Sequence, residues 1–211
     1  MYKKFSLLIL SMIIYSLTFA QINYGFKAGV TESFLHDDGQ GNYDFRTGFQ
    51  IGVFAESPLT NSLNIRSLLQ LTQKGFRAVE GNPEGRFYWN RNFYTSYLEL
   101  PINLVYNFDL NRKANVFIGS GPVFSLFLFG KAKTIIRSTD QTQQTHTEYW
   151  VNTNGPDKKF DMGWEFLIGF KYSRAIISAN YNHGLLNILN SESHIAKNRS
   201  FAFTLGYFLK K

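Results

Sequence analysis

The feature of this sequence that most constrains its fold is a two-residue alternation of apolar and polar side chains. In residues 97–108 the apolar members of the alternation are Leu98, Leu100, Ile102, Leu104, Tyr106 and Phe108. Because successive side chains of a β-strand point to opposite faces, this segment predicts a strand with one apolar face. The same alternation is clear in residues 161–172 and 198–209.

Weaker versions of the alternation bring the number of predicted strands to eight. They lie at residues 22–30, 45–56, where Phe54 breaks the pattern, 63–72, 115–129 and 174–184. The last two are ambiguous in phase. After residue 20, no segment reaches the length of about 20 apolar residues that a transmembrane helix needs.

The connections between the eight predicted strands alternate in length. Long connections lie at 31–44, 73–92, 130–160 and 185–197, and short ones lie at 57–62, 109–114 and Ser173. Outer-membrane barrels have short periplasmic turns and longer extracellular loops. The predicted fold class is therefore all-β: an eight-stranded antiparallel up-and-down transmembrane β-barrel with both chain ends on the periplasmic side.

A soluble sandwich or a lipocalin-like barrel is the alternative to a membrane barrel. Either would bury the apolar faces, which carry Trp164, Phe166, Phe170, Phe201 and Phe203. These rings together are too bulky for the interior of a small barrel, whereas they fit an exterior in contact with lipid. Aromatic residues make up 17% of the chain, which suits the aromatic girdles of outer-membrane barrels.

The first twenty residues predict a secretory signal peptide. Lys3 and Lys4 precede an uncharged apolar run at 5–19, and Thr18-Phe19-Ala20 has the small-x-small form of a cleavage site. The run is short for the alternative, a membrane anchor. We expect a signal peptide at 1–20, a mature start at Gln21 and a single barrel domain at 21–211. The chain has no cysteine, so disulfides do not stabilise it, and a closed barrel pairs its backbone groups without them.

The charge balance gives a weaker indication of partners. The formal charge is +7 from 22 Lys+Arg and 15 Asp+Glu, and it becomes 20 − 15 = +5 once Lys3 and Lys4 are removed. The cations are scattered, so we expect no nucleic-acid partner. We expect a monomer in contact with outer-membrane lipid, with lipopolysaccharide phosphate as a candidate partner and no specific protein partner indicated.

Several short motifs resemble one known family. They are Tyr97-Leu-Glu-Leu-Pro101, Lys74-Gly75, Asp161-Met-Gly163, Tyr181-Asn-His-Gly184-Leu185 and Phe203-Thr-Leu-Gly206-Tyr207. With them the whole mature chain resembles the outer-membrane β-barrel family of Bacteroidota, often called PorT-like. The signal peptide and the barrel pattern predict export to the cell outer membrane, with its assembly machinery as a partner, and some members of the family are linked to protein secretion or gliding. The ending departs from the usual terminal aromatic residue, because Leu209, Lys210 and Lys211 follow Phe208.

Charged residues on the inward faces are the first candidate site. By strand parity the inward charges are Lys27, Arg66, Glu99, Glu165 and Lys171. Charges in a narrow lumen are costly unless they are paired, so we interpret them as a structural ion-pair network. We expect Glu99 to neutralise at least one of the three cations. The alternative is a path for protons or ions, as in a narrow porin-like transport channel.

Catalytic patterns are weak in this sequence. Only Glu192-Ser193-His194 brings together the residue types of a serine lipid hydrolase, and adjacent residues seldom face one another. His146 and Glu148 have the spacing of metal ligands but lack further ones. We expect no enzyme, no cofactor and no metal, and a lipid-modifying barrel enzyme is the least favoured alternative.

The longest connection contains a second candidate site. Lys133–Ser138 and Thr145–Thr153 are rich in residues that favour strands, and the polar segment Thr139, Asp140, Gln141, Thr142 and Gln143 between them is turn-like. We predict a hairpin that extends past the bilayer, interrupted on its return by Gly155-Pro156, with a disordered loop as the alternative. The predicted function is that of an integral outer-membrane barrel with a structural, adhesive or secretion-accessory role, and any adhesive function is expected at this tip.

Overall fold

The computed structural model describes residues 22–37, 43–81, 88–137, 143–151, 158–188 and 195–210, and most of them lie in β-strands. The strands are β1 (Asn23–Asp37), β2 (Tyr43–Asp44), β3 (Arg46–Pro58), β4 (Leu63–Gly81), β5 (Tyr88–Asp109), β6 (Ala114–Arg137), β7 (Gln143–Val151), β8 (Phe160–Tyr172), β9 (Ala175–Gly184) and β10 (Ala196–Lys210). Among these residues no helix is long and apolar enough to cross a membrane.

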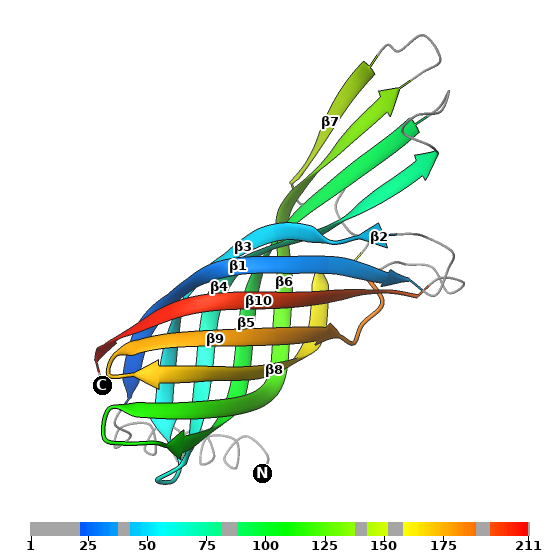
Figure 1. Cartoon of the computed structure of the whole chain (residues 1–211). Helices are drawn as coiled ribbons and strands as arrows, with labels where there is room; N and C mark the ends of the chain where they lie inside the picture. Colours follow the sequence, from blue (N-terminus) through cyan, green and yellow to red (C-terminus); the bar gives the residue numbers. More distant parts are fainter. Residues whose placement is uncertain are drawn as a thin grey trace, which may run out of the picture.

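Eight of the strands close into a ring. The order is β1, β3, β4, β5, β6, β8, β9 and β10, and every neighbouring pair is antiparallel, including β10 with β1. Figure 1 shows the tilted strands of this barrel. The predicted fold class, an eight-stranded antiparallel up-and-down barrel, is confirmed.

The three short connections lie where the sequence places them. Residues 59–62, 110–113 and 173–174 join β3 to β4, β5 to β6 and β8 to β9. The last is a two-residue hairpin turn in which Ser173 has a φ of 55°, the left-handed conformation that tight hairpins with matched twist require. These turns lie at the same end of the barrel as the C-terminal end of β10 (Figure 1), and by the rule for outer-membrane barrels this end faces the periplasm.

The two faces of the barrel wall differ as predicted. Large apolar side chains on the outer face are exposed, among them Val53, Leu104, Phe166, Ile177 and Phe203. The inner face carries most of the buried polar and charged residues. Phe54, the exception to the alternation in β3, points inward and is only 4% exposed.

Three strands continue far beyond the length that a membrane requires. β4, β5 and β6 have 19, 22 and 24 residues, whereas about 9–11 residues suffice for a spanning strand. Their outer parts and β7 form a four-stranded sheet, β4-β5-β6-β7, that rises above the barrel (Figure 1). We call residues 75–81, 88–94, 131–137 and 143–149 the projecting sheet.

The projecting sheet confirms one prediction and corrects another. The hairpin expected in 130–160 is present, because β7 pairs with β6 from Arg137 opposite Gln143 to Phe129 opposite Val151. The connection expected at 73–92 is wrong as a long loop, because β4 and β5 stay paired as far as Gly81 and Tyr88. Of the predicted tip, Gln143 begins β7, while Thr139, Asp140, Gln141 and Thr142 lie outside the described residues, as does Gly155-Pro156.

Side-chain contacts draw β4 towards β1 at the outer end of the barrel. The Thr31 hydroxyl donates to the Gln73 carbonyl at 2.8 Å, and the Gly75 amide donates to the Ser33 hydroxyl at 2.9 Å. Close by, the buried residues Leu35, Ile188 and Ala196 form an apolar cluster against which Tyr43 and Phe76 pack. The outer end of the barrel is therefore narrowed by hydrogen bonds and filled by apolar side chains.

Candidate functional site: the charged lumen

The lumen contains all five charged residues that strand parity places there. Lys27, Arg66, Glu99, Glu165 and Lys171 are each at most 6% exposed. The structure adds three buried charges to the set: Glu56, Lys74 and Asp161. Among the described residues the buried charges are thus four cations and four anions, so the interior is formally neutral (4 − 4 = 0).

Glu56 is the centre of the charge cluster nearest the periplasmic end. Its Oε2 accepts from the Arg66 guanidinium at 2.6 Å, and its Oε1 accepts from Lys171 Nζ at 2.7 Å and from Asn64 Nδ2 at 2.6 Å. Lys171 also donates to Asn107 Oδ1 at 3.0 Å. One carboxylate therefore holds two cations that come from opposite parts of the ring.

Aromatic rings surround this cluster. Phe117 lies 4.6 Å from the Arg66 guanidinium and 5.3 Å from Lys171 Nζ, measured to the ring centroid. The buried core here consists of Phe54, Leu68, Val105, Phe117, Leu167, Ile176 and Phe208. Cations over ring faces are favourable, more so when desolvated. The periplasmic end of the lumen is therefore packed with apolar and charged groups together.

Glu99 pairs with a residue that sequence reasoning did not name. Lys74 Nζ lies 2.6 Å from Glu99 Oε1, and both side chains are at most 4% exposed. The carboxylate also accepts hydrogen bonds from Thr72 at 2.7 Å, Gln70 at 2.9 Å and Ser125 at 3.0 Å. The expectation that Glu99 would take Lys27, Arg66 or Lys171 as its ion-pair partner is wrong.

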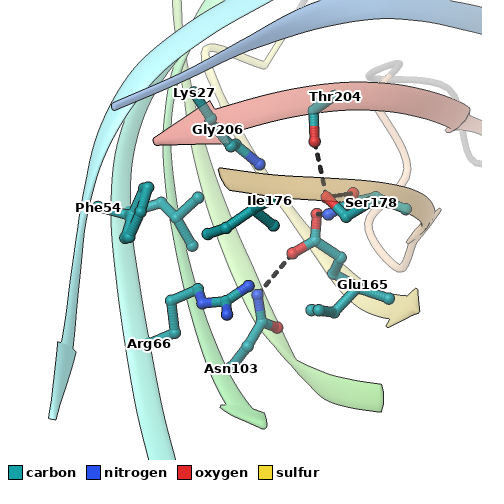
Figure 2. Close-up of a pocket in the computed structure, with 12 residues that line it drawn as sticks. Lys27, Phe54, Arg66, Asn103, Glu165, Ile176, Ser178, Thr204 and Gly206 are labelled. Atoms are coloured by element: carbon teal, nitrogen blue, oxygen red, sulfur yellow. Dashed lines mark hydrogen bonds between the residues drawn. The ribbon is translucent and has the colours of Figure 1, made fainter. Parts of the chain in front are cut away.

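Glu165 lies between these two clusters. Its carboxylate accepts from Asn103 Nδ2 at 2.6 Å and from Asn180 Nδ2 at 2.9 Å. Figure 2 shows Lys27 and Arg66 pointing into the same space from other strands. The cavity that they line has a volume of about 20 Å³, which holds roughly one water molecule. The middle of the lumen is therefore filled rather than open.

Glu56 and Lys74 were missed for different reasons. Glu56 has inward parity but ends its predicted strand, next to the turn with Pro58, where pairing is hard to infer. Lys74 follows the predicted end of its strand at Thr72, so the sequence pattern places it in a loop. Extending the parity count from Arg66 through Gln70 to Lys74 is the signal that finds it.

In the residues that it describes, the structure does not bring the candidate catalytic or metal-binding side chains together. His146 lies exposed on β7, and Glu148 forms an ion pair with Arg91 at 3.2 Å. In the described ranges no three His, Cys, Asp or Glu residues come together as metal ligands. Glu192-Ser193-His194 lies outside the described residues.

A closed ring of eight antiparallel strands, apolar outside and filled with paired charges inside, defines an integral outer-membrane β-barrel. The sequence agrees with this class. The model of the outer membrane protein β-barrel domain family matches residues 19–190, and the chain belongs to that family. The protein is therefore located in the cell outer membrane, where its exterior contacts lipid.

Solved barrels resemble the chain at low identity. Ail, the attachment invasion locus protein of Yersinia pestis, is 15% identical with a TM-score of 0.42 over 89% of this chain and 99% of its own. Neisserial surface protein A is 14% identical with a TM-score of 0.46 over 89% and 97%. OprG from Pseudomonas aeruginosa is 12% identical with a TM-score of 0.43 over 90% and 95%. No curated protein matches the chain.

Proposed function

We propose that this protein is a non-conducting outer-membrane anchor that holds the projecting sheet outside the cell as a binding surface, in an adhesive or secretion-accessory role. The observation that carries the proposal is the extension of β4, β5 and β6 into a sheet with β7 beyond the barrel. A closer kinship with the PorT-like barrels of Bacteroidota, some of them linked to secretion, belongs to the same proposal.

The filled lumen supports an anchor over a channel. An eight-stranded barrel has an interior that side chains just fill. Here the periplasmic layer holds Glu56 with its two cations, and the outer layer holds Glu99 with Lys74. We propose that these pairs are structural, because each carboxylate already has a cation and further donors around it.

The length of the projecting sheet supports a surface for partners. β6 continues for seven residues from Lys131 to Arg137, which is roughly 20 Å along a strand. A spanning strand needs none of this length, and further out than the register pair of Lys131 and Tyr149 the paired arm holds exposed side chains such as Thr145 and His146. A rigid, raised surface suits recognition of a partner because little ordering is needed on binding.

Shortening the β6–β7 arm tests the binding role. Residues 133–147 would be replaced by Asn-Gly, which closes a two-residue turn between Ala132 and Glu148, already opposite each other in register. A matched control keeps the arm and replaces residues 139–142 with Gly-Ser-Gly-Ser. We expect producing cells to adhere to matrix-coated surfaces and to lose this adherence with the shortened arm. Equal adherence by cells that produce the full and shortened proteins would contradict the role of the arm, and loss in the control as well as in the shortened protein would assign binding to the tip.

Conductance in planar bilayers tests the anchor. We expect no discrete current steps from the purified wild-type protein. Reproducible steps that change when Glu165 is replaced by Gln would favour the alternative of a narrow channel.

A further inference from the structure

A hollow lies on the outer face of the projecting sheet where it leaves the barrel. It has a volume of about 240 Å³ and is lined by Gln73, Tyr94, Ser96, Phe129, Gly130, Lys131 and Tyr149. None of these residues belongs to the lumen network. The hollow is on the face of β4, β5 and β6 that is lipid-facing further down. The register of β5 with β6 shifts between Ser96 and Tyr97, which leaves Leu128 as an extra residue on β6, while Leu98, Ser96 and Tyr94 share one face of β5 by parity.

The position of the hollow relative to the membrane follows from the band of apolar side chains on the outer face of the barrel. On β4, β5 and β6 the apolar residues of the outer face extend as far as Leu71, Leu98 and Phe129, and the next outer-face residues are Gln73, Ser96 and Lys131. At the same level Glu32 and Thr47 interrupt the apolar face of β1 and β3, beyond which the rings of Phe34 and Phe45 pack together. Hydrocarbon therefore ends between these two rows, and the hollow begins at the level of the lipid headgroups.

Two cations meet one aromatic ring at this level. The Arg46 guanidinium carbon lies 3.5 Å from the centroid of the Tyr94 ring, and Lys131 Nζ lies 5.1 Å from it. Lys131 is the register partner of Tyr94 on β6, and Gly75 is its partner on β4. Gly75 has no side chain on that flank of the ring, and Arg46 reaches the ring from β3, where it is the register partner of Ser33; it lies beside the hollow and is not among the residues that line it.

The positive charge of this cluster is only partly compensated. Lys131 forms no ion pair with an acidic residue of the part of the chain that the structure describes. Glu32 interacts with Arg46 electrostatically and accepts a hydrogen bond from the Thr47 hydroxyl at 2.6 Å, so one carboxylate accompanies the two cations of the cluster. The Nε atom of Arg46 is buried and has no hydrogen-bond partner. The cluster is thus suited to an anionic group with several acceptor oxygens.

We propose that Arg46, Tyr94 and Lys131 bind the phosphorylated headgroup of an outer-leaflet lipid, the chemistry that lipopolysaccharide presents. Arginine and lysine form strong charge-assisted hydrogen bonds with phosphate, and a tyrosine hydroxyl donates one more. Tyr149, opposite Lys131 in register, closes the outer side of the hollow. The acyl chains of such a lipid would lie along Phe129 and the apolar band below it.

The lipid site has a function of its own beyond the adhesive proposal. It fixes the base of the projecting sheet to the leaflet surface, so that the sheet stands at a defined angle. Because lipid binding is measured on the purified protein without any adhesive partner, failure of one proposal leaves the other unaffected.

The test is titration of the purified protein in neutral detergent with hexa-acylated diphosphoryl lipid A, followed by native mass spectrometry. A cation close to an anionic membrane surface strengthens binding about fivefold, so Arg46→Gln and Lys131→Gln should each weaken lipid A binding by about that factor, and together by more. Lys133→Gln is the matched control, because Lys133 is an exposed lysine on the same strand and face, one row further out. Lys131→Arg should keep the affinity.

Three results would overturn the proposal. One is unchanged affinity in the Arg46→Gln/Lys131→Gln double variant, provided that its heat-modifiable gel shift shows a folded barrel. Another is equal loss in Lys133→Gln, which would indicate attraction by net charge alone. The third is displacement of lipid A by millimolar inorganic phosphate, which would indicate a site for the free anion.

Discussion

The barrel and the projecting sheet are built from the same strands, yet they follow different rules. Within the membrane, β5 alternates strictly, with exposed Leu104 on one face and buried Asn103 on the other. Past the apolar band the same strand carries polar residues on both faces, as at Asn90 and Arg91. Lipid requires a continuous apolar face and water does not. Strand pairing therefore continues where the alternation stops, together with ring contacts such as that of Phe76 with Phe93, whose centroids are 4.3 Å apart.

Ion pairs are buried in the barrel and exposed in the projecting sheet. Lys74 and Glu99 in the lumen are both at most 4% exposed, whereas Arg91 and Glu148 in the projecting sheet are 32% and 44% exposed. Removing one member of a buried pair leaves an uncompensated charge, while an exposed pair is already solvated. The comparison predicts large effects in the barrel and small ones in the sheet.

The largest effect is expected at Glu56, because two cations depend on it. Glu56→Gln should lower the free energy of unfolding by about 3–5 kcal/mol, the usual cost of breaking a buried ion pair. Urea unfolding from lipid vesicles measures it. The triple variant Glu56→Leu, Arg66→Met, Lys171→Met removes all three charges and should recover most of that stability. A triple variant no more stable than Glu56→Gln would show that packing, rather than uncompensated charge, carries the effect.

The next effect concerns the lipid face. Phe166 lies midway along β8 and is 52% exposed on the outside, so Phe166→Arg should lower the free energy of unfolding by about 2–4 kcal/mol. The matched change in the projecting sheet is Thr145→Arg, at an exposed position of β7, which should stay within about 0.5 kcal/mol of wild type. If both arginines destabilise equally, the assignment of the membrane boundary is wrong.

The contrast between the barrel and the projecting sheet explains which features of the lumen could be predicted from the sequence alone. Lipid facing made the inward position of Glu99 and Glu165 predictable, because their strand neighbours Leu98 and Phe166 had to face hydrocarbon. The partner of Glu99 was not predictable, because it depends on the stagger of β4 against β5, which places Gln70 opposite Glu99 and brings Lys74 within reach. Parity fixes a face, but it does not fix the height in the lumen at which two charges meet.

The extent of the projecting sheet was predictable only in part. The β-rich segments around 133–138 and 145–153 indicated one hairpin, and the structure contains it. Residues 73–92 gave no such signal, because a strand in water needs no continuous apolar face. Arg46, Tyr94 and Lys131 lie on three different strands of that region, so no local sequence motif predicts their cluster.

The third prediction sharpens the assignment of the Glu99 partner. A double-mutant cycle between Lys74→Met and Glu99→Gln should give a coupling energy of about 1–3 kcal/mol, within the range for residues in direct contact. The corresponding cycle between Lys27→Met and Glu99→Gln should give a smaller value, since no direct contact joins the two side chains. Equal coupling in both cycles would mean that the lumen charges act as one diffuse field rather than as pairs.

The smallest effect is expected for the exposed pair of the projecting sheet. A cycle between Arg91→Gln and Glu148→Gln should give less than about 1 kcal/mol, because both groups remain largely hydrated and the pair must hold two flexible side chains in place. The Debye length falls from about 10 Å at 0.1 M salt to about 3 Å at 1 M, so the coupling should vanish at the higher concentration. The coupling of Lys74 with Glu99 should persist there, because salt does not enter a filled lumen. Loss of both couplings in 1 M salt would show that ions reach the interior, and it would revive the channel as the function of this barrel.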